Sequence, residues 1–115
     1  MMIRTNYRYQ VKSRDRLLCV YLAGEIDHHS AVFLREELDE LILRERPARF
    51  VLYLEEIEFM DSAGLGLLMG RYRLMKELGG TMAIAEPNER VMKILRLCGM
   101  ERFFEISKSP RGERI

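Results

Sequence analysis

The serine best placed for chemistry in this sequence lies in residues 59–66 (FMDSAGLG). An apolar segment leads into Asp61 and Ser62, and apolar residues follow at helical spacing, so Ser62 is expected at a helix start. A hydroxyl at that position lies outside the hydrogen-bond ladder of the helix. It does not match the nucleophile of an α/β-hydrolase, because that turn needs glycine two positions earlier, where this chain has Met60. A plainer interpretation stands beside it: Asp61 or Ser62 only caps the helix.

A second polar cluster, residues 24–29 (GEIDHH), follows another strand-like segment. Three interpretations are open for Glu25 and Asp27: ordinary turn residues, a pair for acid–base chemistry, or a site that binds arginine of a partner. His28 and His29 are more typical of a solvated loop than of a metal site, because no HExxH or Cys-x-x-Cys spacing supplies further ligands. Since nothing brings these histidines to Ser62, we expect no enzyme active site.

The glycines near Ser62 do not form a phosphate-binding loop. Gly64 and Gly66 lack both the downstream Gly-Lys-Ser/Thr of a P-loop and the third glycine of a dinucleotide fingerprint. Gly66 and Gly70 are four residues apart, a spacing that permits close packing against a sheet or a partner. Cys19, in an apolar run, and Cys98, at an expected helix end, are both predicted to be packing residues.

The composition excludes several classes of protein. The 115 residues contain 19 Lys and Arg against 18 Asp and Glu, so general binding to nucleic acid or anionic membranes is not indicated. No apolar run approaches the roughly 20 residues of a membrane span, and the first residues do not resemble a secretory signal. Two cysteines suit a reducing compartment. We therefore expect a cytoplasmic protein with one domain, residues 1–107, and a polar tail, residues 108–115.

The elements that must position these residues alternate between strand-like and helix-like segments. Strands are expected at residues 3–11, 17–22, 50–54 and 81–85, with an edge strand or packed tail at 103–106. Helices are expected from an N-cap at Ser30 to Pro47, from Ser62 to residues 79–80, and from Asn88 to Gly99. The order β-β-α-β-α-β-α, with a possible final strand, predicts an α/β fold: a small mixed sheet packed against helices, with its later strands parallel.

Together, residues 22–31 (LAGEIDHHSA) and 59–66 resemble the two signature segments of STAS domains, and within these the bacterial anti-anti-sigma factors, or anti-sigma factor antagonists. The His-His pair and the downstream Gly70 are most similar to the family members that act in sporulation. The likeness extends over roughly residues 10–106. The resemblance implies the STAS fold, a small mixed sheet packed against helices, and a regulatory protein without enzymatic activity, cofactor or metal.

The resemblance also implies a mechanism. In this family the unmodified antagonist binds an anti-sigma factor kinase, the sigma factor is released, the kinase phosphorylates one serine of the antagonist, and a serine phosphatase reverses the modification. Ser62 matches that serine, while Ala63 stands where sporulation members usually have a second serine. Positions on the partner-binding face match Glu25, Asp27, Asp61, Gly64, Leu65 and Gly66. We expect a monomer when free, with no nucleic-acid or membrane partner.

Two alternatives to this function are open: a STAS regulator of another, stress-type partner-switching pathway, and a nucleotide-binding STAS domain. The missing P-loop disfavours the second. The charge pattern adds an expectation, because the first helix is acidic and the next two are basic (Glu36, Glu37, Asp39 and Glu40 against Arg71, Arg73, Lys76, Arg90, Lys93 and Arg96). This pattern is either an ordinary solvated distribution or a basic side that steers docking onto an acidic partner.

Overall fold

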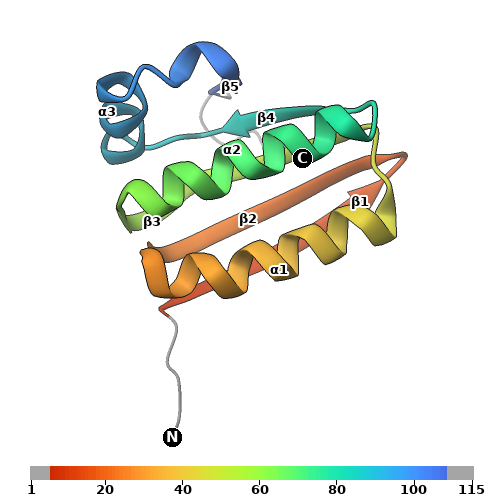
Figure 1. Cartoon of the computed structure of the whole chain (residues 1–115), viewed down its shortest axis with the longest axis horizontal. Coiled ribbons are helices and arrows are strands. Elements are labelled where there is room, and N and C mark those ends of the chain that lie inside the picture. The colour runs from red at the N-terminus through yellow and green to blue at the C-terminus, as the bar shows by residue number, and fades with distance from the viewer. Residues whose placement is uncertain (1–5, 109–115) are drawn as a thin grey trace, which may run out of the picture.

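The helices and strands alternate along the chain in the order expected from the sequence (Figure 1). The computed structural model describes residues 6–108. Its strands are β1 (Tyr7–Arg14), β2 (Leu17–Ile26), β3 (Arg49–Met60), β4 (Thr81–Ala85) and β5 (Glu105–Ser107). Its helices are α1 (His28–Glu45), α2 (Ser62–Glu77) and α3 (Glu89–Leu97), followed by a short 3-10 helix, η1 (Glu101–Phe103). The predicted fold class is confirmed, whereas the tail expected at residues 108–115 lies outside the described residues, except for Lys108.

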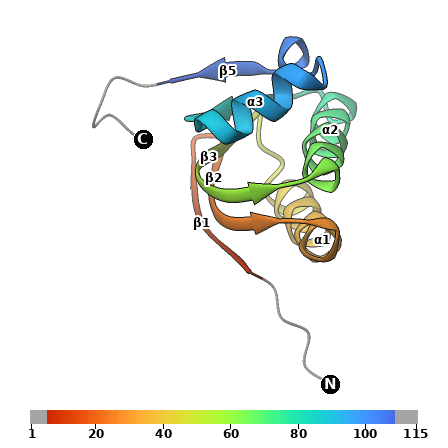
Figure 2. The same cartoon turned by 90° about the vertical axis from the view of Figure 1, so that its left-hand side faces the viewer.

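The strands lie in the sheet in their chain order, β1-β2-β3-β4-β5. Among the strands of the described residues, only β1 runs antiparallel to its neighbour, so the expected mixed sheet with parallel later strands is confirmed. The turn from β1 to β2 uses Asp15 and Arg16 at positive φ, 52° and 64°, which matches the twist of a tight hairpin. The next two connections contain α1 and α2, and both helices lie over the same face of the sheet (Figure 2).

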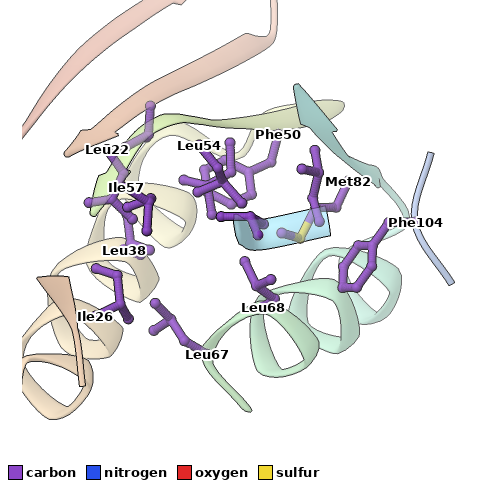
Figure 3. Packing of buried hydrophobic residues seen from close by; sticks show 14 of the residues in the cluster. Leu22, Ile26, Leu38, Phe50, Leu54, Ile57, Leu67, Leu68, Met82 and Phe104 are labelled. Atoms are coloured by element: carbon purple, nitrogen blue, oxygen red, sulfur yellow. The ribbon is translucent and has the colours of Figure 1, made fainter. Parts of the chain in front are cut away.

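The main hydrophobic core lies between that face and the helices (Figure 3). Alternate residues of β2 and β3 point into it because side chains alternate across a strand, and each helix adds an apolar stripe. Its fully buried members include Leu18, Val20, Phe50, Leu52, Leu54, Leu34, Leu38, Ile42, Leu68, Met75, Val91 and Leu95. A smaller cluster on the opposite face contains the stacked pair Tyr21 and Tyr53, whose ring centroids are 4.2 Å apart.

The two central strands are longer than their apolar runs predicted. β2 continues past residues 23–24 to Ile26, and β3 continues past Leu54 to Met60. Pairing between the two strands extends to Ile26 opposite Met60, so strand pairing, rather than local apolar content, sets where they end. The first strand is likewise displaced, because β1 follows its partner β2 to Arg14 instead of ending at residue 11.

Two side chains lie in other surroundings than expected. Arg71, expected on a basic side, is buried in α2, and its Nε lies 2.7 Å from Oδ1 of Asp39 on α1. This ion pair links the acidic helix α1 to the basic helix α2. Because Arg71 is buried, it is not part of a basic surface. Cys98 is exposed rather than packed, whereas Cys19 is buried as predicted, and both are free thiols. No helix in the described part of the chain is both long and apolar enough to span a membrane.

Candidate functional site

The two motifs meet where the neighbouring parallel strands β2 and β3 end. Glu25 pairs with Phe59 in the sheet, Ile26 pairs with Met60, and the amide of Asp61 donates to the carbonyl of Ile26 at 3.2 Å. Helices α1 and α2 therefore begin beside each other, at the left-hand edge of the view (Figure 1). The structure thus brings residues 24–29 and 59–66 together at one edge, a juxtaposition that neither motif indicates alone.

At the start of α2, Asp61 and Ser62 have separate roles. Asp61 is the N-cap, because its Oδ1 accepts a hydrogen bond of 2.8 Å from the amide of Ala63. Ser62 is the first helical residue, and its side chain is exposed. Of the two capping interpretations, the one that assigns the cap to Asp61 is confirmed. The hydroxyl of Ser62 is therefore not used by the cap and lies at the surface, where the positive end of the helix dipole is located.

At the start of α1, Asp27 and Ser30 form a capping box, so the prediction of Ser30 as the N-cap is wrong. Asp27 is the N-cap: its Oδ1 accepts from the amides of His29 at 3.0 Å and Ser30 at 2.9 Å. Ser30 reciprocates, because its Oγ accepts from the amide of Asp27 at 2.9 Å. The hydrogen bond from the Ser30 amide lowers the pKa of the Asp27 carboxyl, and the Ser30 hydroxyl and the His29 amide act in the same direction. Desolvation by burial opposes this shift.

Glu25 is held in place through the residue that precedes it. Gly24 has a φ of +101°, and a Cβ there would lie 2.1 Å from the carbonyl oxygen of Asn6. That same oxygen accepts a hydrogen bond of 2.8 Å from the amide of Glu25. The register between β2 and β3 shifts between Gly24 and Glu25, and such bulges re-aim side chains. Glu25 is half-buried at this rim.

The glycines of α2 differ in what surrounds them. A Cβ on Gly64 would lie 2.4 Å from Cγ of Met60 and 3.3 Å from Cγ2 of Ile26, so this glycine lets the helix start pack on the strand ends. At Gly66 and Gly70, such a Cβ would have no atom of another described residue packed within 4 Å. Gly64 and Leu65, both expected on the partner-binding face, are buried in the free protein, and Gly66 is exposed. The packing therefore requires Gly64 but does not require Gly66.

A shallow groove of about 320 Å³ runs between the first turns of α1 and α2, beside Ser62. Its lining residues are His28, Ala31, Val32, Arg35, Ala63, Gly66 and Leu67. Val32 is 49% exposed, and Phe59, at the end of β3, is 46% exposed.

Sequence reasoning missed Val32, Arg35 and Phe59 as residues of this surface. Val32 lies off the apolar stripe of α1, and Phe59 resembles a core residue until the strand register is known. Another hollow, of about 370 Å³ on the opposite face over β1, β2 and β3, contains none of the expected site residues.

The histidine pair belongs to the helix start rather than to a loop. His28 and His29 are the first two residues of α1, both exposed, with ring centroids 4.1 Å apart. Within residues 6–108, no three His, Cys, Asp or Glu side chains are grouped so that they could hold a metal ion. What the edge offers is therefore one exposed hydroxyl, a rim of carboxylates from Glu25, Asp27 and Asp61, and an apolar groove, which is a surface suited to binding a protein.

The chain is similar in sequence and in structure to known proteins. The model of the STAS domain family matches residues 8–111. An "Anti-sigma F factor antagonist" of Paenibacillus polymyxa is 37% identical over 101 residues, which cover 88% of this chain and 86% of that protein. An "Anti-sigma-B factor antagonist" of Bacillus subtilis (strain 168) is 33% identical over 107 residues, covering 93% of this chain and 96% of that protein. Among solved structures, the anti-sigma factor antagonist SpoIIAA in its unphosphorylated form superposes with a TM-score of 0.77 at 25% identity, over 90% of each chain.

Proposed function

Because the chain belongs to the STAS domain family, and within it to the anti-sigma factor antagonists, we propose that it is a phosphorylation-controlled binding module. Its unphosphorylated form binds an anti-sigma factor that is also a serine kinase, and the sigma factor is thereby released. The kinase phosphorylates Ser62, and a serine phosphatase removes the phosphate. The protein itself performs no catalysis and acts in the cytoplasm as a monomer, with no nucleic-acid, membrane, cofactor or metal partner.

The observation that carries this proposal is the position of Ser62. Its side chain is exposed at the first residue of α2, and the cap there is made by Asp61, so the hydroxyl can be modified without loss of the cap. A phosphoserine adds about −1.5 to −2 charges and three acceptor oxygens. At a helix N-terminus a phosphate is locally favourable because free amides and the dipole face it. The fold is therefore expected to survive the modification.

The partner surface, in contrast, is expected to reject the phosphate. Ser62 lies at an edge that already carries Asp61, with Asp27 and Glu25 at the adjacent strand end. A partner that fits a small hydroxyl beside three carboxylates would lose packing and would face a concentrated negative charge. Each loss of about 1.4 kcal/mol weakens binding tenfold, so a few kcal/mol suffice to switch binding off. In this proposal Glu25, Asp27, Asp61 and Gly66 contact the partner directly, and Gly64 and Leu65 shape the surface from beneath.

The identity of the sigma factor has two candidates. The relatives include antagonists of an anti-sigma F factor and of an anti-sigma-B factor, at 37% and 33% identity. The higher identity and the sequence similarity to sporulation members favour the F type. A stress-type pathway with a B-type partner is the second candidate, and it uses the same serine.

The test is to map the phosphate. The protein is incubated with ATP and, separately, with an F-type and a B-type anti-sigma factor kinase, and the modified residue is identified by mass spectrometry. We expect one phosphate, on Ser62, from one of the two kinases, and none on Ser62→Ala. A phosphate on any other residue would refute the assignment of the site, and labelling by neither kinase would refute the proposed function.

A further inference from the structure

Within residues 6–108, the end of β3 that leads to Ser62 has a strand on one side only. Pairing of β3 with β4 ends at Tyr53 opposite Ala85, whereas pairing with β2 continues to Met60. Over this stretch β3 also carries two irregularities, because residues 53–56 lie opposite residues 21–23 and residues 57–59 lie opposite residues 24–25. A bulge leaves ladder groups unpaired, and backbone carbonyls in such a place need other donors.

The start of α3 supplies those donors. Nδ2 of Asn88 donates to the carbonyl of Glu55 at 3.1 Å and to that of Ile57 at 2.7 Å. A guanidinium nitrogen of Arg90, Nη1, donates to the carbonyl of Glu58. All three acceptors lie within the six residues that precede Asp61. Two side chains at the start of α3, those of the N-cap Asn88 and of Arg90, thus donate where a neighbouring strand would otherwise do so.

The side-chain amide of Asn88 uses both its nitrogen and its oxygen, and it therefore has one orientation. Its Oδ1 is the N-cap acceptor of α3 and receives the amide of Val91 at 2.9 Å, while its nitrogen donates twice to β3. Exchanging its oxygen and nitrogen would break all three bonds, because the nitrogen only donates and the oxygen only accepts. Asn88 therefore fixes the distance between the start of α3 and the end of β3.

We propose that Asn88, assisted by Arg90, is a positioning residue for Ser62, an inference that rests on Ser62 being the phosphoacceptor. The end of β3 is fixed on one side by β2, including the bond from Asp61 to Ile26, and on the other side by Asn88 and Arg90. Met60 packs directly beneath Gly64, so a displacement of β3 reaches the first turn of α2. Phosphoryl transfer depends on how precisely the attacking hydroxyl is held, and a displacement of about 1 Å can cost about 100-fold in rate.

The substitution Asn88→Asp separates the two roles of this residue. A carboxylate still accepts the amide of Val91 and caps α3, but it cannot donate to Glu55 and Ile57. Arg90→Ala is the second variant, because Arg90 is exposed and its loss leaves the cap and the core intact. The matched control is Val91→Ala, which weakens the packing of the buried Val91 on the core without touching the bonds to β3.

Two readouts test the proposal. Hydrogen–deuterium exchange of the free protein should rise by roughly tenfold at residues 55–64 in Asn88→Asp, and less in Arg90→Ala, while Val91→Ala should raise exchange mainly in α3. With the kinase that modifies the wild type, kcat for Ser62 should fall by roughly tenfold in Asn88→Asp, with KM nearly unchanged.

The exchange measurement decides the positioning claim without any kinase. Wild-type exchange at residues 55–64 in Asn88→Asp would overturn it, and so would an increase of equal size there in Val91→Ala, since the effect would then be one of general stability. Absence of any phosphate on the wild-type protein would overturn the proposed function instead, and a phosphate on another residue would overturn the assignment of Ser62 on which this inference rests. The proposal is supported if residues 55–64 exchange more slowly in the wild type than in both Asn88→Asp and Arg90→Ala.

Discussion

At the scale of single residues, Asp61 and Ser62 have separate roles at the start of α2, and the proposed switch depends on that separation. Asp61 makes the cap, and Ser62 carries an exposed hydroxyl that the cap does not use. The sequence could not separate them, because Asp and Ser are almost equally good N-caps. The same degeneracy explains the error at α1: Asp27 and Ser30 both resemble caps, and only the observed capping box shows that Ser30 is the reciprocal partner.

The division of roles predicts different stabilities for two neighbouring substitutions. Asp61→Ala removes the cap bond and should lower the free energy of unfolding by about 1 kcal/mol. Ser62→Ala should change it by less than about 0.5 kcal/mol, because the side chain is exposed. Urea denaturation followed by circular dichroism measures both. Equal losses would show that Ser62 contributes to the helix start.

Alanine substitutions at the two nearby glycines, Gly64 and Gly66, should change stability in opposite directions. Gly64→Ala places a methyl group 2.4 Å from Met60 and should destabilise the protein, by about 1–3 kcal/mol as for overpacked cores. Gly66→Ala meets no atom within 4 Å and should stabilise the free protein by about 0.5–1 kcal/mol, the helix preference of Ala over Gly. Thermal unfolding tests both. Binding of Gly66→Ala to the anti-sigma factor should nevertheless weaken, since the proposed role of this glycine is in the partner interface.

At the scale of elements, the site depends on two parallel strands that end side by side and on what fixes them. The alternation of strands and helices was predictable from apolar periodicity and breakers, and β4 was predicted to the residue. The lengths of β2 and β3 were not predictable, because pairing across the sheet holds polar residues such as Glu56 in strand conformation. The bonds from Asn88 to β3 were equally invisible, since they join residues more than 30 positions apart.

The edge strand β1 is attached to α1 by a pair of tyrosines. The hydroxyls of Tyr7 and Tyr9 donate to the two carboxylate oxygens of Glu37, at 2.8 and 2.7 Å. Burial, followed by the hydrogen bond to Glu37, raises the pKa of Tyr9 to about 12, and the same causes raise the pKa of Tyr7 further. The bonds hold only while the phenols are protonated.

This arrangement predicts a loss of stability at high pH. The folded-state pKa of each tyrosine lies above its unfolded value of about 10, so the contribution is complete below pH 10 and is lost as the pH rises towards about 12 and beyond. The double variant Tyr7→Phe with Tyr9→Phe should lose less stability than the wild type between pH 9.5 and about 11.5, because it has no such phenols to ionise. Urea denaturation at several pH values measures the slopes. Parallel slopes for the two proteins would contradict the assignment.

At the scale of the whole molecule, the net charge of +1 conceals an uneven distribution. The ion pair between the buried Arg71 and the half-buried Asp39 links the two helices and removes Arg71 from the expected basic surface. The main charged feature is instead the rim of carboxylates from Glu25, Asp27 and Asp61 near Ser62. It forms where β2 and β3 end side by side and helices α1 and α2 begin. The fold class and the position of Ser62 at a helix start could be predicted from the sequence, but the groove beside Ser62 could not, because its lining comes from two helices whose relative position depends on the sheet.

The proposed switch assigns the decisive charge to one residue, so one comparison tests it most directly. The affinities of the wild type, Ser62→Ala and Ser62→Asp for the anti-sigma factor kinase are measured by isothermal titration calorimetry. Ser62→Ala should bind as the wild type does, and Ser62→Asp should bind at least about tenfold more weakly, a loss of about 1.4 kcal/mol or more. Equal affinities of Ser62→Ala and Ser62→Asp, with both variants folded, would contradict the account.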